Sequence, residues 1–233
     1  MTLKDTLATM KKAGTEQNRK IYSNHGAVLP QYGVSFAELS RLAKRIGTDQ
    51  KLADKLWKTG NHDARILACM VADAEAMTSS HLDSWARELV DYIICDAFCK
   101  LVIRTPHAAK KATIWRDRKS EFVAAAGWEV TGLLAWDQNS ELTDGDAAKL
   151  IKQIAKEIHD RPNRTRHSMN QTLICLGVRS GKLHKQAVAA AKKIGPVYVN
   201  HGKTSCTTPD AIQYMAKTLE HRKKKVSRIR LPR

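Results

Sequence analysis

Apolar residues recur at helical spacing through most of this chain, in segments of about ten residues separated by glycine, proline or small polar residues. The stretch around residue 40 shows the pattern. Ser35 and Glu38 have the spacing of a capping box, apolar residues follow over 39–46, and Gly47 ends the run. The one strand-like stretch, 196–199, is too short to build a sheet. The chain is therefore predicted to be all-α.

The number and length of these segments limit how the helices can pack. About ten to twelve short helices cannot form a four-helix bundle, whereas helix pairs stacked on their neighbours would bury every apolar stripe. We therefore predict a helical solenoid. Two helices are expected to start at Thr105-Pro106 and Thr208-Pro209, with threonine as the cap and proline in the first turn. Further helices are expected at 62–74, 80–91, 120–136, 165–178 and 182–195, and one after Thr143.

The charge balance predicts an anionic partner. Forty Lys and Arg against 23 Asp and Glu leave a formal net charge of +17, and such a chain repels itself unless anions screen it. The sequence has no apolar run near the ~20 residues that a membrane-spanning helix needs, and its first residues lack the apolar centre of a secretory signal. Nucleic acid, and not a membrane, is the expected partner.

The five cysteines predict a reducing compartment, because their number is odd and they form no compact framework. Cys95 and Cys99 have the i, i+4 spacing that would allow a shared metal ion. No second Cys/His pair stands at the spacing of a zinc finger, so no metal is expected. We expect buried free thiols in a cytoplasmic protein.

Basic residues gather along two stretches and at the C-terminal end. We expect the two stretches to form a stripe that faces DNA phosphates. Residues 221–233 hold seven basic residues and no acid, which is typical of a basic tail following a single domain over residues 1–220. The candidate DNA contacts are Lys110, Lys111, Arg116, Arg118, Lys149, Lys152, Arg161, Arg164, Arg166 and Arg179.

Seven short motifs appear in an order that resembles one known family. They are LSRLAK at 39–44, LADKLW at 52–57, HDARILA at 62–68, DYIICD at 91–96, EFVAAAGW at 121–128, SMNQTL at 168–173 and GKTSC at 202–206. Together they resemble the bacterial DNA-alkylation-repair proteins, the AlkD-like glycosylases, over about residues 20–220.

This resemblance implies a right-handed superhelix of HEAT-like repeats whose concave, basic face holds duplex DNA. Active members of the family remove cationic alkylated bases such as 3-methyladenine and 7-methylguanine without rotating the lesion into a pocket, and they need no metal or organic cofactor. A bacterial, nucleoid-associated monomer that binds double-stranded DNA, alkylated or branched, is therefore expected.

The catalytic aspartate of the family falls on Asp96, and its aromatic neighbour four positions earlier falls on Tyr92, where active members have tryptophan. A carboxylate close to the deoxyribose would stabilise the positive charge that develops as the glycosidic bond breaks. Because Tyr92 is at i−4 from Asp96, the two share a helix face. A buried structural pair for Asp96 and plain packing for Tyr92 are the alternatives.

Two further positions of the family differ in this chain. The catalytic arginine maps to Ala125 and a second tryptophan maps near Gln171. Arg116, Arg118 or Arg179 are the candidates to replace the arginine in space. Three functions therefore stay open: excision of alkylpurines, binding of damaged or structured DNA without catalysis, and a helical scaffold that binds proteins.

Overall fold

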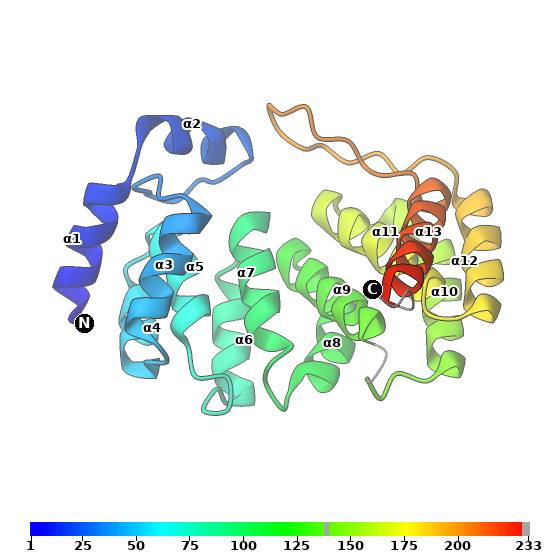
Figure 1. Ribbon diagram of the computed structural model, residues 1–233, viewed down its shortest axis with the longest axis horizontal. Helices are drawn as coiled ribbons and strands as arrows, with labels where there is room; N and C mark the ends of the chain where they lie inside the picture. Colours follow the sequence, from blue (N-terminus) through cyan, green and yellow to red (C-terminus); the bar gives the residue numbers. More distant parts are fainter. Residues whose placement is uncertain (138–139, 230–233) are drawn as a thin grey trace. The chain divides into compact units, whose positions relative to one another are not determined.

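The computed structural model describes residues 1–137 and 140–229, with side chains as far as Lys224 (Figure 1). Over these residues the chain forms thirteen α-helices and one 3-10 turn, and no strand. The prediction of an all-α chain is confirmed, and the stretch 196–199 is an irregular connection as expected. None of the described helices is long and apolar enough to cross a membrane.

The helices group into two compact units, and the first comprises residues 1–130 together with 201–206. Within it, α5 packs against α3, α4 and α7. Aromatic rings fill the space between its helices: Trp57 stacks on Trp85 with ring centroids 4.1 Å apart, and Phe98 lies between Trp57 and Trp115. The helices of this unit are α1 (Leu3–Ala13), α2 (Glu16–Asn24), α3 (Phe36–Ile46), α4 (Gln50–Lys58), α5 (His62–Val71), α6 (Ser79–Arg87), α7 (Tyr92–Val102), α8 (Ala108–Arg116) and most of α9 (Glu121–Trp136).

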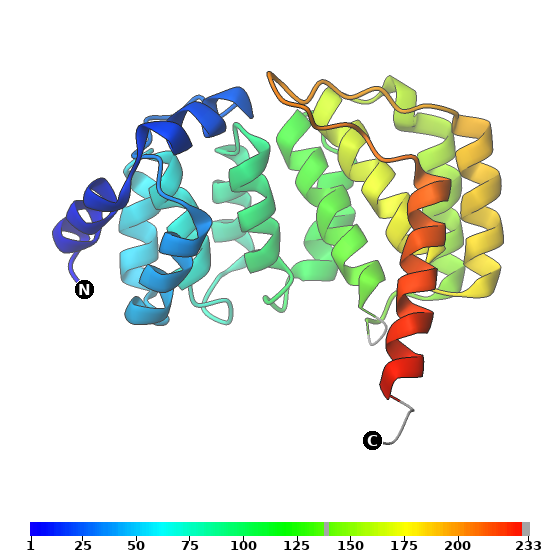
Figure 2. The same cartoon turned by 45° about the horizontal axis from the view of Figure 1, so that its top comes forward.

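The second unit comprises residues 131–200 and 207–233, and α11 is its central helix. In Figure 2 its helices stand side by side, and α11 packs against α10, α12 and α13. Close packing requires a glycine at residue 177, since a Cβ there would stand 2.1 Å from the Met215 sulfur and 2.7 Å from the Ala187 Cβ. The elements are α10 (Asp144–Glu157), η1 (Ile158–Asp160), α11 (Asn163–Gly177), α12 (Gly181–Ile194) and α13 (Ala211–Ile229).

Most helices begin at a residue whose side chain accepts a hydrogen bond from the first turn, as expected for helix caps. Ser35 accepts from the Glu38 amide at 3.3 Å, which confirms the predicted start of α3. The predicted cap at Thr105 is wrong. Its hydroxyl donates to the Val102 carbonyl and closes the preceding turn, so that α8 begins three residues later.

The start and the length of α13 also differ from expectation. The Asp210 carboxylate accepts from the Gln213 amide at 2.9 Å, so Asp210 and not Thr208 caps the first turn. Residues 221–229, expected within a basic tail, continue α13 as helix. Residues 230–233 lie outside the described residues. A single domain over 1–220 stays a prediction.

A buried carboxylate on α5 fixes the loop between α2 and α3. Asp63 is fully buried and accepts hydrogen bonds from three successive backbone amides, those of Tyr32 (2.6 Å), Gly33 (3.1 Å) and Val34 (3.0 Å). Gly33 has a φ of +77°, which favours glycine, and a Cβ there would stand 2.4 Å from the Thr15 carbonyl oxygen. The loop can therefore take only a conformation that presents three amides to Asp63.

We expect Asp63→Ala to lower the free energy of unfolding by about 3 kcal/mol or more, because it leaves buried amides without an acceptor. Urea denaturation followed by circular dichroism measures this loss. The matched control is Asp73→Ala, since Asp73 also accepts from two backbone amides but in an exposed loop. A loss at Asp63 no larger than that of the control would contradict this role.

Candidate functional site

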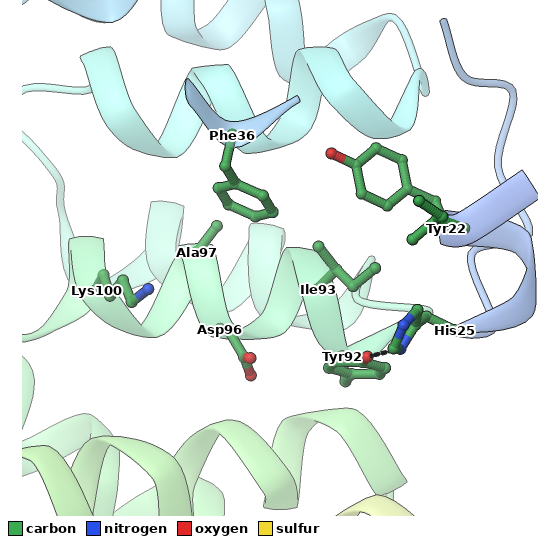
Figure 3. A pocket seen from close by; sticks show the side chains of 9 residues that line it. Tyr22, His25, Phe36, Tyr92, Ile93, Asp96, Ala97 and Lys100 are labelled. Carbon is green, nitrogen blue, oxygen red and sulfur yellow. Dashed lines mark hydrogen bonds between the residues drawn. The ribbon is translucent and has the colours of Figure 1, made fainter. Parts of the chain in front are cut away.

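The two catalytic residues predicted from sequence line the same pocket on α7. The pocket has a volume of about 250 Å³ and lies within the first unit. Tyr92 and Asp96 stand one turn apart and project from the same side of the helix (Figure 3). Both are half-buried, whereas Ile94 and Phe98 are fully buried on the opposite side. The helix thus divides into a core side and a pocket side.

The start of α7 is fixed directly beside Tyr92. Asp91 is 2% exposed, and its carboxylate accepts from the Ile94 amide at 3.0 Å. Fully buried His62 brings its Nε2 to 3.7 Å from the same Asp91 oxygen. Because this cap sets where the first turn begins, it also sets the direction in which Tyr92 and Asp96 point.

His25, at the C-terminal end of α2, holds the Tyr92 ring from the other side of the pocket. The Tyr92 hydroxyl is hydrogen-bonded to His25 Nδ1, and the two rings meet edge to face with centroids 5.9 Å apart (Figure 3). The sequence analysis missed His25. No local pattern could have found it, since 67 positions separate the two residues.

Lys100 provides the cation of the pocket. It is exposed on α7, four positions after Asp96, so both charges line one side of the same helix. The apolar part of the lining includes Phe36 and Ile93, which meet on the far side of α7 from Asp96 (Figure 3). Sequence reasoning also missed Lys100, although its i, i+4 spacing from Asp96 was a usable signal.

Tyr22 closes the apolar end of the pocket as a neutral phenol. Its hydroxyl donates to the Val34 carbonyl at 2.7 Å. Burial, together with the negative charge of Asp63, raises the pKa of Tyr22 to about 12. The pocket lining therefore includes one carboxylate, two hydrogen-bonded phenols and one ammonium group, with the apolar side chains across α7 from the carboxylate.

None of the positions considered for the missing catalytic arginine supplies one to this pocket in the described structure. Ala125 is 2% exposed in α9. The Arg116 guanidinium lies over the Trp128 ring at 5.5 Å, and burial lowers the pKa of Arg116. Arg118 is exposed in the turn after α8. Among the residues that line the pocket, Lys100 is the cation instead.

Arg179 has a structural role in the second unit. Its guanidinium donates to the carbonyl oxygens of Ala135 (3.1 Å), Asp137 (2.9 Å) and Leu142 (2.7 Å), so it holds the chain between α9 and α10. Gln171, near the mapped position of the second tryptophan, is half-buried in α11. Both residues belong to the second unit, whereas the α7 pocket belongs to the first.

The other predicted DNA contacts differ in how much of the side chain reaches solvent. Arg161 is engaged in an ion pair with Glu157, and exposed Lys149 pairs with Asp146 at 2.9 Å. The half-buried side chains are Arg161, Arg164 and Arg166, and the exposed ones are Lys110, Arg118, Lys149 and Lys152.

The prediction that Lys111 contacts a phosphate is wrong, because this lysine is only 1% exposed. Its ammonium group lies 2.7 Å from the Asp83 carboxylate, which also accepts from the Trp115 indole N–H at 2.8 Å. Burial acts to raise the pKa of Asp83, but the hydrogen bonds from Lys111 and Trp115 outweigh it and hold that pKa below its ordinary value. Lys111 is thus the buried half of an ion pair whose acid, Asp83, is half-buried.

Some of the cysteine thiols are buried and others are not. Cys69, Cys95 and Cys99 are buried as expected, and burial raises the pKa of Cys69 and of Cys99. The Cys95 and Cys99 sulfur atoms face carbonyl oxygens of α9 at 3.9 and 3.7 Å. The expectation of burial is wrong for Cys206, which is exposed. Over the described part of the chain, no three His, Cys, Asp or Glu side chains are placed to hold a metal ion.

Comparison with known proteins gives matches over most of the chain. The family described as "DNA alkylation repair enzyme" matches residues 6–215. The uncharacterized protein Lin0241 of Listeria innocua is 30% identical over 206 residues, which cover 85% of this chain and 88% of that protein. The uncharacterized protein Lmo0209 of Listeria monocytogenes is 29% identical over the same shares.

A solved structure gives the fold comparison. It represents "a new family of proteins related to the HEAT-like repeat DNA glycosylases with affinity for branched DNA structures" and superposes with a TM-score of 0.86 at 28% identity, covering 95% of each chain. The HEAT-like-repeat fold that the sequence motifs implied is confirmed.

We expect Lys111→Ala to lower the free energy of unfolding by about 2 kcal/mol, because it leaves the part-buried Asp83 carboxylate without its cation. The matched control is Lys110→Ala, which replaces the exposed neighbouring lysine and should change the free energy of unfolding by less than about 0.5 kcal/mol. Urea denaturation measures both. Equal losses in the two variants would contradict the buried ion pair.

The same variants should show a pH dependence. Since folding lowers the pKa of Asp83, the stabilisation it provides is complete above its ordinary value of 3.8 and is lost as the pH falls through the folded-state value. The difference in stability between the wild type and Lys111→Ala should therefore shrink in acid.

Proposed function

Because this chain belongs to the DNA alkylation repair enzyme family, we propose that it binds double-stranded DNA, including branched DNA, with the α7 pocket against the bound strand. The observation that carries the proposal is the formal charge of +17 on a HEAT-like-repeat fold. A polyanion supplies the screening that such a charge requires, and the release of its counterions drives binding.

The exposed cations are the proposed phosphate contacts. Buried Lys111 drops out of the set predicted from sequence, while Lys110, Arg118, Lys149 and Lys152 present their charges to solvent. The half-buried arginines Arg116, Arg161, Arg164 and Arg166 stay in the proposed set as supporting contacts. Arg179 leaves the set, because its guanidinium already donates to backbone carbonyl oxygens of the second unit. Flexible ammonium and guanidinium groups of this kind position DNA without reading its bases.

Affinity for branched DNA is described for the family represented by the solved structure, and the 28% identity over nearly the whole chain supports extending that property to this protein. A protein that recognises the shape of DNA depends more on where its phosphate contacts lie than on contacts with the bases. We also propose that the protein is a monomer and associates with the nucleoid.

DNA binding is expected to weaken with salt, with a log-log slope of about 0.9 for each phosphate contacted. The double variant Lys110→Ala/Arg118→Ala should bind duplex more weakly and lower that slope by about 2. Fluorescence anisotropy of labelled duplex over a series of salt concentrations measures both quantities.

The matched control removes two exposed lysines of α4, in Lys51→Ala/Lys55→Ala. It lowers the net charge equally, and its slope should stay within experimental error of the wild type. A salt-independent affinity of the wild type would contradict DNA binding by charge.

Excision of cationic alkylpurines is a second candidate, which Asp96 and Tyr92 favour by lining one pocket. As the bond between C1′ and the base nitrogen breaks, the Asp96 carboxylate would stabilise the positive charge on the deoxyribose, and the Tyr92 ring face would add cation–π attraction. The bonding electrons leave with the base, which departs as a neutral molecule. Water then adds to C1′ and releases a proton to the solvent, which leaves a hydroxyl group on the deoxyribose. The described lining of the pocket lacks the catalytic arginine of the family, which favours DNA binding without excision. DNA binding is therefore the primary proposal.

If the protein excises alkylpurines, Asp96→Asn should lower the rate of 3-methyladenine or 7-methylguanine release by about 100-fold or more, since it removes the stabilising charge while keeping the shape. Chromatography of the bases released from methylated duplex under single-turnover conditions measures the rate. The affinity of this variant for DNA should equal that of the wild type or be slightly higher, because a negative charge is lost.

Asp5→Asn, on exposed α1, is the control for a general charge effect and should release bases at the wild-type rate. A wild-type protein that binds the methylated duplex and releases no base would reject excision and leave the binding function in place.

A further inference from the structure

A second pocket, larger than that on α7, lies entirely within the second unit. It opens between α10 and α12, which pack directly against each other and run side by side (Figures 1 and 2), and it has a volume of about 760 Å³. We call it the lysine groove, after Lys152 and Lys156 of α10 and Lys193 of α12, which line it.

The three ammonium groups of the lysine groove have no acid among the residues that line it. All three lysines are exposed, and within the described part of the chain none of them forms an ion pair shorter than 4 Å. Two acids of α10 pair with other residues. Asp146 pairs with Lys149, and Glu157 pairs with Arg161. Three like charges around one hollow raise its affinity for anions.

Ile151 and Gln186 also line the groove, together with three short side chains, Ala155, Ala189 and Ala190. The three alanines let a backbone approach closely without a steric barrier. Lys152 and Lys156 are one turn apart, about 6 Å along the helix axis, so that each ammonium group can meet a different phosphate of one DNA strand. A sugar–phosphate backbone therefore matches both the charge and the spacing of the groove.

We propose that the lysine groove binds the sugar–phosphate backbone of a second DNA arm and so makes the protein prefer branched over linear DNA. This inference rests on the proposed DNA-binding function. A linear duplex held by the phosphate contacts proposed above leaves Lys156 and Lys193 to another segment of DNA, and a junction supplies that segment within the same molecule. The effective concentration of the second arm is then high, which raises the affinity for the junction.

The test is the double variant Lys156→Ala/Lys193→Ala, which keeps Lys152 because that residue is already a proposed duplex contact. It is compared with Lys51→Ala/Lys55→Ala, which removes two exposed lysines from α4. Anisotropy is measured with a four-way junction and with a linear duplex of the same arm sequence. The groove variant should lose about ten-fold or more in affinity for the junction and less than about two-fold for the duplex. The control variant should lose equally little for both.

If the groove variant loses equal affinity for junction and duplex, the groove contacts the same duplex as the other cations. That result would overturn the second-arm proposal. An unchanged junction affinity would overturn it as well. If the wild type binds neither DNA, the proposed function itself fails, which is a different result from either of these.

Acetylation of lysines in the wild-type protein, read by mass spectrometry, avoids any effect of substitution on folding. Lys156 and Lys193 should be protected by the junction but not by the duplex, while Lys51 and Lys55 react equally in both. Protection of the groove by a polyglutamate peptide and not by the junction would assign it to an acidic protein segment and overturn the proposal.

Discussion

The structure depends on keeping a large excess of positive charge out of an apolar core. Among the described residues, Arg65 and Lys111 are the buried cations, and each is paired: Arg65 lies 2.5 Å from Glu88 and Lys111 lies 2.7 Å from Asp83. An unpaired charge in these places would cost several kcal/mol. The remaining excess therefore reaches solvent, where it repels itself and favours a polyanionic partner.

The α7 pocket shows how a stable core positions polar groups. Asp63 holds the loop before α3 through three backbone amides, including that of Val34, and Tyr22 donates to the carbonyl of Val34. Tyr22 lies on α2, the helix that ends next to His25, and His25 holds the Tyr92 ring. These hydrogen bonds, together with helix α2, thus connect α5 to the pocket.

Sequence patterns predicted the features that depend on near neighbours along the chain. The helical class, the cap at Ser35 and the shared face of Tyr92 and Asp96 all follow from spacings of three or four residues. The errors have equally local causes. One step along a helix turns a side chain by about 100°, so exposed Lys110 and buried Lys111 look alike in sequence. His25 depends on a contact across 67 positions, which no periodicity encodes.

In the proposed complex, bound DNA lies against the α7 pocket. Replacement of Tyr92 by the photo-cross-linking residue p-benzoylphenylalanine tests this placement directly, since this residue bonds to C–H groups that its ring touches. After irradiation with duplex DNA, we expect a covalent adduct on a deoxyribose, read by mass spectrometry. A variant that still binds DNA and yields no adduct would contradict this placement of the DNA.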